Sequence, residues 1–304
     1  MVILGLRELA HAVHEGERLG EARKLERPLE RAVDLCPGFG RHEVTIYHRL
    51  PMTVSTENAA AEREPRRAGR ELLLESVFRP AANGLVPVFS RLAVPPPAVV
   101  LANAAAGFVA ALLLARGELV AAALVLQLKT LLDNLDGQLA RATGQVTLTG
   151  RYLDTLADLV VNAALFAALA DVTDRPLLAL GSFLALTVVL AFDFNATELY
   201  REAHGISPTR PRAAGGRAER ALGASYALLL RPLDRAAGAL AERLPSRRTY
   251  DAFTVTALAN MGLTTQLAVL GLCLALGSPA AYLWIVLACL AAVVSLHLRA
   301  ERFG

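Results

Sequence analysis

Six long apolar stretches fill the second two thirds of this 304-residue chain. A helix that crosses a membrane needs ~20 consecutive, mostly apolar residues. Hydrophobic residues make up 54% of the chain and are concentrated in these stretches. The sequence therefore predicts an all-α integral membrane protein with six transmembrane helices, at about 97–115, 119–136, 151–170, 176–195, 253–276 and 279–296.

The distribution of arginine predicts the orientation of these helices. The short connections at 116–118, 171–175 and 277–278 hold only two arginines, Arg116 and Arg175. The other side holds the N-terminal region, the loop from 141 to 151, the segment 199–250 and the C-terminal tail, which are richer in arginine. Because basic loops stay in the cytoplasm, we expect both termini to be cytoplasmic. The first residues contain no apolar stretch long enough for a signal peptide, which agrees with this orientation.

Composition divides the chain into three regions. Residues 1–67 are rich in Arg and Glu and are expected to form a cytoplasmic N-terminal extension, with a strand-like alternation near 44–47. Residues 68–92 combine apolar and arginine residues, and Pro80 and Pro87 are expected to interrupt any single straight helix. We interpret this region as amphipathic juxtamembrane helices on the membrane surface, the alternative being a soluble helix pair packed on the extension. Residues 93–304 form the six-helix transmembrane domain.

A basic cytoplasmic insertion, residues 199–250, interrupts the transmembrane domain. Between Tyr200 and Tyr250 it holds ten arginines against four acidic residues. Its composition favours amphipathic helices broken by glycine and by Pro232. Such a segment is either a solvated loop or a surface that attracts anionic headgroups. The net charge of the whole chain is only +3, which gives no case for nucleic-acid binding.

Four aspartates lie where the second and third predicted spans meet the cytoplasm. Asp133 and Asp136 are three residues apart, and Asp154 and Asp158 are four apart, so each pair shares one helix face. Carboxylates at the edge of a bilayer are costly unless cations or a charged substrate compensate them. Hard divalent cations prefer such oxygen ligands. The spacing therefore predicts a site for two divalent cations, Mg²⁺ or Mn²⁺, which would also attract a diphosphate.

Small and basic residues between the two aspartate pairs complete the pattern. Gly137 is expected to end the second helix and release it into a loop. Ala140 keeps the site shallow, and Arg141 offers a bidentate fork for phosphate. Gly150 opens the third helix, where backbone amides favour anions, and Thr147 adds a hydroxyl.

The combined pattern is Asp-x2-Asp-Gly-x2-Ala-Arg-x8-Gly-x3-Asp-x3-Asp, and it resembles the signature of the CDP-alcohol phosphotransferase (CDP-alcohol phosphatidyltransferase) family. The resemblance implies a homodimeric enzyme that moves a phosphatidyl group from a CDP-alcohol, such as CDP-diacylglycerol, to an acceptor hydroxyl and releases CMP. The resemblance covers about residues 70–190 and is looser beyond, and together with the predicted spans it makes residues 93–304 the catalytic domain. The arginine distribution predicts that its active site lies at the cytoplasmic face of the cell membrane. The resemblance also implies the site residues: metal ligands Asp133, Asp136, Asp154 and Asp158, with Asp158 the general base, and CDP contacts Gly137, Ala140, Arg141, Thr147 and Gly150.

The first predicted span departs from the family pattern. The family commonly has a Pro-Asn pair and a threonine there, whereas this chain has Pro96-Pro97 and Val100 and retains Asn103. The acceptor is not specified by the sequence. Lys129 is interpreted as the ion-pair partner of Asp133 four residues later, the alternative being a role in acceptor binding, and Asp193 is a second candidate for the acceptor pocket.

Two other functions use similar residues. A membrane prenyltransferase also binds a diphosphate through aspartates and Mg²⁺, but its two motifs are separated by far more sequence. An ion transporter with a carboxylate cage would place its site near the bilayer midplane. Release of CMP from a CDP-linked lipid distinguishes the predicted enzyme from both.

Overall fold

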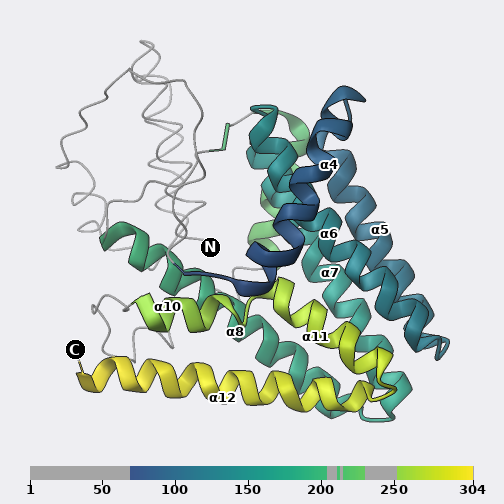
Figure 1. Ribbon diagram of the computed structural model, residues 1–304, viewed down its shortest axis with the longest axis vertical. Helices are drawn as coiled ribbons and strands as arrows, with labels where there is room; N and C mark the ends of the chain where they lie inside the picture. Colours follow the sequence, from purple (N-terminus) through teal and green to yellow (C-terminus); the bar gives the residue numbers. More distant parts are fainter. Residues whose placement is uncertain (1–68, 204–210, 213–214, 230–251, 304) are drawn as a thin grey trace. The chain divides into compact units, whose positions relative to one another are not determined.

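The computed structural model describes residues 69–203, 211–212, 215–229 and 252–303 (Figure 1). The chain divides into two compact units, Met1–Glu64 and Pro65–Gly304, and all described residues belong to the second. The predicted N-terminal extension and its strand-like alternation near 44–47 lie outside the described residues. In the described part, extended backbone pairs only at one isolated parallel bridge, between Thr147 and Arg212.

Helices make up nearly all of the described part. They follow one another as η2 (Leu74–Phe78), α4 (Arg79–Arg91), α5 (Pro96–Ala115), α6 (Leu119–Ala142), α7 (Leu148–Thr173), α8 (Pro176–Ala203), α10 (Ala252–Ala259), α11 (Leu263–Ala275) and α12 (Pro279–Phe303). Residues 217–229 are also helical. The prediction of an all-α chain is therefore confirmed for the described residues.

Four helices, α5, α7, α8 and α12, are long and apolar enough to cross a membrane, and the pair α10–α11 counts as a fifth span if it is taken together. The second predicted span corresponds to α6, which is 24 residues long. It lies outside this group because Lys129, Asp133 and Asp136 interrupt its apolar sequence. Six spans and cytoplasmic termini therefore stay predictions, while the described part contains four helices, or five with the bent pair, that are long and apolar enough to span a membrane.

The outer surface of these helices is apolar. Only 22–39% of the most apolar stretch of each spanning helix is buried within the protein. Leu177 is 84% exposed and Leu124 is 68% exposed. A water-soluble protein rarely exposes so large an apolar surface, so lipid is the solvent that fits it.

The helices that carry the aspartates pack closely against α5. A side chain at Gly107 of α5 would collide with Val161 of α7 and would approach Cε of Lys129 to 3.3 Å. Small residues at helix crossings let backbones approach in this way. The close crossing brings α5 against both α6 and α7, about one helical turn from Asp133 and Asp158.

The predicted fifth span is a bent pair of helices instead of one straight helix. α10 ends at Ala259, α11 begins at Leu263, and the two axes differ by 44°. The side chain of Asn260 donates to the carbonyl of Arg70 (2.6 Å) and accepts from the amide of Leu72 (2.9 Å). These bonds tie the bend to the chain before η2, a partner 188–190 residues away that no local pattern indicates.

The juxtamembrane prolines also differ from their prediction. Pro80 lies in the first turn of α4, and Pro87 lies inside it without ending the helix. Pro80 has no N–H to donate to the preceding helical turn, and the wider turn of η2 lies directly before it. The residues from 72 to 91 therefore form one continuous helical stretch, in which η2 is a single wider turn. Its interfacial position stays a prediction.

Candidate functional site

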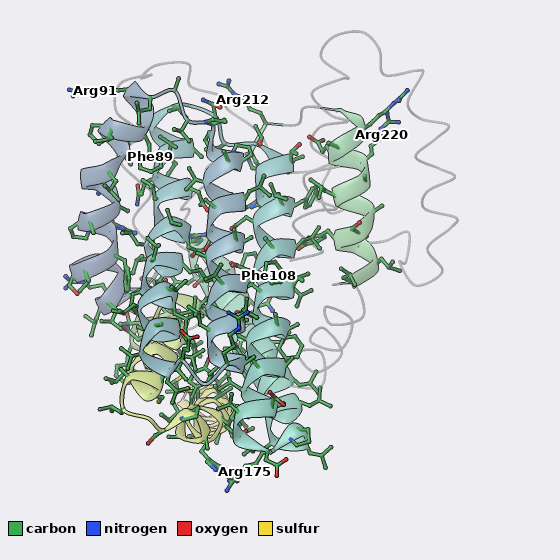
Figure 2. All side chains as sticks on the ribbon, turned by 90° about the vertical axis from the view of Figure 1, so that its right-hand side faces the viewer. Phe89, Arg91, Phe108, Arg175, Arg212 and Arg220 are labelled. Carbon is green, nitrogen blue, oxygen red and sulfur yellow. The ribbon has the colours of Figure 1, made fainter. Side chains whose placement is uncertain are left out.

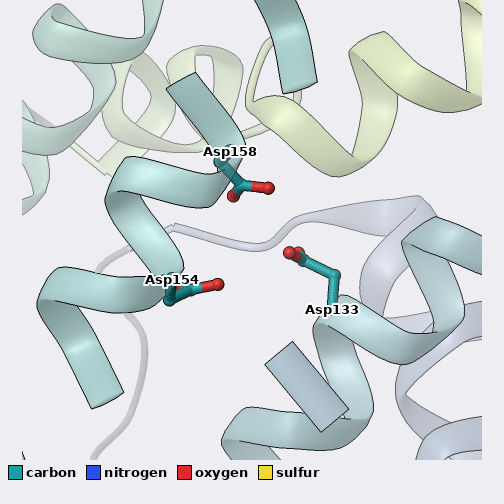
Figure 3. A group of neighbouring side chains, drawn as sticks. All are labelled: Asp133, Asp154 and Asp158. Carbon is teal, nitrogen blue, oxygen red and sulfur yellow. The ribbon is translucent and has the colours of Figure 1, made fainter. Parts of the chain in front are cut away.

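Three of the four predicted aspartates converge. Asp133 on α6 and Asp154 and Asp158 on α7 each offer a carboxylate oxygen, and these oxygens lie within 4.8 Å of one another (Figure 3). The spacing of four residues on α7 places its two carboxylates on the face turned toward α6. This group, the aspartate cluster, has the spacing and the oxygen donors that a divalent cation requires.

Asp136, the fourth aspartate, lies outside that group but near it. It is 7% exposed, and its charge interacts with those of Asp133 and Asp158. Among the described residues, one oxygen of Asp136 (Oδ2) and one of Asp154 (Oδ1) are buried and have no hydrogen-bond partner. Buried carboxylate oxygens without donors are rare. A bound cation would satisfy them, so the residues present fit a metal.

Two polar side chains from inside the bundle hold the aspartate cluster. Asn103 on α5 donates to Asp133 (3.0 Å). Lys129 is fully buried, donates to Asp158 (2.9 Å) and lies 3.9 Å from Asp133. The predicted pair with Asp133 is present, but the shorter contact goes to Asp158 on the neighbouring helix. Several carboxylates thus face one ammonium group, and the excess negative charge favours divalent cations.

Gly137 has a different role from the predicted one. The prediction that it ends the second helix was wrong, because α6 continues to Ala142 and Gly144 (φ 66°) turns the chain after it. The guanidinium of Arg141 instead lies over Gly137, with Nη2 3.4 Å from where a Cβ would stand. A Cβ at Gly137 would make only an ordinary contact there, so the feature that matters is the position of Arg141, whose guanidinium lies beside the residue that follows Asp136.

The two predicted CDP contacts at the start of α7 bond to each other. Thr147 is the N-cap of α7, and its hydroxyl accepts a hydrogen bond from the amide of Gly150 (3.1 Å). This cap satisfies one of the first amides of the helix. Ala140 and Arg141, in the last turn of α6, and Thr147 and Gly150, at the start of α7, therefore flank the short connection between the two helices.

Asp193 lies at the bend between α10 and α11. A Cβ on Gly262 would stand 3.4 Å from an oxygen of Asp193 and 3.7 Å from one of Glu71. Glu71 is 8% exposed, and its charge interacts with that of Asp133. No sequence pattern indicated Glu71 as a site residue, because it lies in the predicted juxtamembrane segment, far from the aspartates in sequence. Asp193 and Glu71 thus form a second acidic location near the aspartate cluster.

A buried amide lies at the same bend. Gln266 is 2% exposed and donates to the carbonyl of Met261 (3.3 Å). Its Oε1 and the hydroxyl of Thr265 are buried and have no hydrogen-bond partner among the described residues. Both residues lie at the start of α11, and these two atoms are polar groups available to a small polar ligand.

A protein-family model, CDP-alcohol phosphatidyltransferase, matches residues 93–296 of the chain. Neither the curated proteins nor the solved structures yield a match. The matched region contains the aspartate cluster and every predicted CDP contact. Members of this family are divalent-metal-dependent membrane enzymes that use a CDP-alcohol donor and a hydroxyl acceptor. Because the match covers two thirds of the chain, including the site, the chain belongs to the CDP-alcohol phosphatidyltransferase family.

Proposed function

We propose that this protein transfers a phosphatidyl group from a CDP-alcohol, such as CDP-diacylglycerol, to the hydroxyl of an acceptor and releases CMP. The observation that carries the proposal is the convergence of Asp133, Asp154 and Asp158 within the region that matches the family. The aspartate cluster and the diphosphate of the donor are both negatively charged. The cluster can therefore bind the donor only when divalent cations lie between them.

The metal ligands would be the aspartate cluster together with Asp136. Two ions, Mg²⁺ or Mn²⁺, fit this number of carboxylates. When bound, they supply electrostatic stabilisation to the attacking and leaving oxygens of the phosphoryl group. The uncompensated oxygens of Asp136 and Asp154 support this assignment.

Asp158 is the proposed general base. Lys129 donates to one of its oxygens and so fixes the orientation of the carboxylate. The acceptor hydroxyl attacks the lipid-side phosphorus, its proton passes to Asp158, and the bond from that phosphorus to the oxygen of CMP breaks. Arg141, beside Gly137, is placed to bind a phosphate of the donor.

We further propose that this site opens at the cytoplasmic face of the cell membrane. Arg91 and Arg212 lie at one end of the bundle and Arg175 at the opposite end (Figure 2). The turn between α6 and α7 lies at the end with Arg212, because Thr147 pairs with that residue. The arginine-rich regions predicted for the same side favour a cytoplasmic position for this end of the bundle. The homodimer that the resemblance implies stays a prediction.

The proposed function predicts metal-dependent release of CMP. Purified protein in lipid vesicles with CDP-diacylglycerol is expected to release CMP only with a suitable acceptor and with Mg²⁺ or Mn²⁺. A panel of glycerol phosphate, inositol phosphate, serine and other polyols identifies the acceptor. Excess chelator is expected to abolish release, and added cation to restore it. Full activity in chelator, or no release of CMP with any acceptor, contradicts the proposal. Release of diphosphate from a prenyl donor would instead indicate a prenyltransferase, and cation flux without CMP release would indicate an ion transporter.

The acceptor is proposed to bind at the bend between α10 and α11. Asp193 and Glu71 both lie near Gly262 at this bend, and Gln266 donates to the carbonyl of Met261 within it. Lys129 instead contacts two members of the aspartate cluster. Replacing Asp193 with asparagine is expected to raise the KM of the acceptor about tenfold, the loss of one charge-assisted hydrogen bond, with the donor KM unchanged.

The matched control for this substitution is Asp174→Asn. Asp174 caps the far end of α7 in the left-handed conformation (φ 53°), which asparagine tolerates. This variant is expected to retain both KM values. An unchanged acceptor KM in Asp193→Asn, or a change confined to the donor, would exclude Asp193 from the acceptor pocket.

A further inference from the structure

Part of the basic insertion contacts the turn between α6 and α7. The amide of Arg212 donates to the carbonyl of Val146 (2.8 Å), and the amide of Leu148 donates to the carbonyl of Arg212 (3.1 Å). Thr147 lies between these two bonds in extended conformation (φ −123°, ψ 153°). The chain around Arg212 therefore acts as a one-residue parallel strand that fixes the backbone before α7.

The helix at 217–229 extends this contact along α7. Tyr226 is 7% exposed, and its ring lies against that of Tyr152 with centroids 5.1 Å apart. The helix backbone at Gly223 also lies against this ring, since a Cβ there would stand 3.5 Å from Tyr152, an ordinary van der Waals distance. The hydroxyl of Thr149 contacts Glu219 (3.3 Å). In Figure 2 this helix, which carries Arg220, stands beside the bundle.

These contacts fall on the residues that surround the donor site. Thr147 and Gly150, which bond to each other across the first turn of α7, flank Thr149, and Tyr152 is one half-turn further along. A binding loop that is already ordered loses less conformational freedom when its ligand binds. The bridge, the aromatic pair and the hydroxyl contact together hold this loop in one arrangement.

We propose that residues 211–212 and 215–229 position the turn between α6 and α7 for the CDP part of the donor, with Tyr226 as the principal positioning residue. This role rests on the proposed function and adds to it an element outside the aspartate pattern. The contacts that hold this segment go to Val146, Leu148, Thr149 and Tyr152, before and along the first turns of α7. Loss of these contacts should therefore weaken donor binding and leave the rate of the chemical step and acceptor binding unaffected.

The test compares Tyr226→Ala with Tyr226→Phe and with Leu228→Ala. Tyr226→Ala removes the ring contact and is expected to raise the donor KM and the dissociation constant of CMP about tenfold, equivalent to one well-packed aromatic contact. The value of kcat is expected to stay within about twofold, and the acceptor KM to stay unchanged. Tyr226→Phe keeps the ring and should resemble the wild type. Leu228 is 76% exposed on the same helix, so its truncation should have no effect.

A second variant keeps the test decisive if Tyr226→Ala does not fold. Thr149→Val removes the hydroxyl that contacts Glu219 and is expected to raise the donor KM by a smaller factor. Unchanged donor KM and CMP binding in Tyr226→Ala, an equal change in Leu228→Ala, or a fall in kcat alone would overturn the proposal. A wild-type protein that releases no CMP would instead contradict the proposed function, so the two failures are distinguishable.

Discussion

Replacing Asp158 with asparagine is expected to lower kcat by about 10²–10⁴-fold, the contribution typical of a general base. Binding of the CDP-alcohol should stay close to that of the wild type. Asparagine has the shape of aspartate, and its amide oxygen can still accept the hydrogen bond from Lys129, which is 2.9 Å long in the native chain. The variant therefore keeps the fold of the site and loses the group that removes the proton of the acceptor.

Both quantities have to be measured on the same preparation: turnover from the rate of CMP release, and donor binding from the dissociation constant of the CDP-alcohol. The control is Asp171→Asn, an exposed aspartate at the other end of α7, which should leave both quantities unchanged. Turnover of Asp158→Asn within tenfold of the wild type would exclude the base assignment. Loss of donor binding as well as turnover would assign Asp158 to the metal ligands alone.

Much of the site could be predicted because its residues are local in sequence. The spacings of four aspartates predicted two helix faces, and the structure brings three of them together within 4.8 Å. The position of Lys129 was also informative, since a buried cation one turn from Asp133 needs a negative partner. Its shorter bond to Asp158 depends on how α7 packs against α6, which spacing within one helix does not contain.

The features that could not be predicted depend on distant parts of the chain. Asn260 bends the fifth span by bonding to backbone groups near Arg70, although the composition around it favours one helix. Gly137 has the sequence context of a helix end, yet the hydrogen bonds of α6 continue to Ala142. The pairing of Arg212 with the turn before α7 joins segments whose local patterns are a basic loop and a helix start. In each case a tertiary contact outweighs the local preference.

Lys129→Met is expected to make the stability of the protein depend on divalent cations. Lys129 has no exposed side-chain surface and lies 2.9 Å from Asp158 and 3.9 Å from Asp133, while its stem packs near Gly107. Methionine preserves that packing and removes the charge. Breaking a buried ion pair on one side costs about 3–5 kcal/mol, because it leaves the partner charge uncompensated. A cation bound by the aspartates supplies the missing positive charge.

Thermal unfolding in detergent, with chelator and with Mg²⁺, separates this effect from a simple loss of packing. In chelator the variant should unfold at a clearly lower temperature than the wild type, and Mg²⁺ should raise its Tm more than that of the wild type. Leu128→Met, at the adjacent lipid-facing position that is 49% exposed, should match the wild type in both conditions. Equal cation-induced shifts in Lys129→Met and the wild type would mean that Lys129 does not compensate the aspartate cluster. A larger Mg²⁺-induced rise in Tm for Lys129→Met than for the wild type would show that the lysine keeps the site folded when no cation is bound. This role would explain why a full positive charge is buried among carboxylates that themselves bind cations.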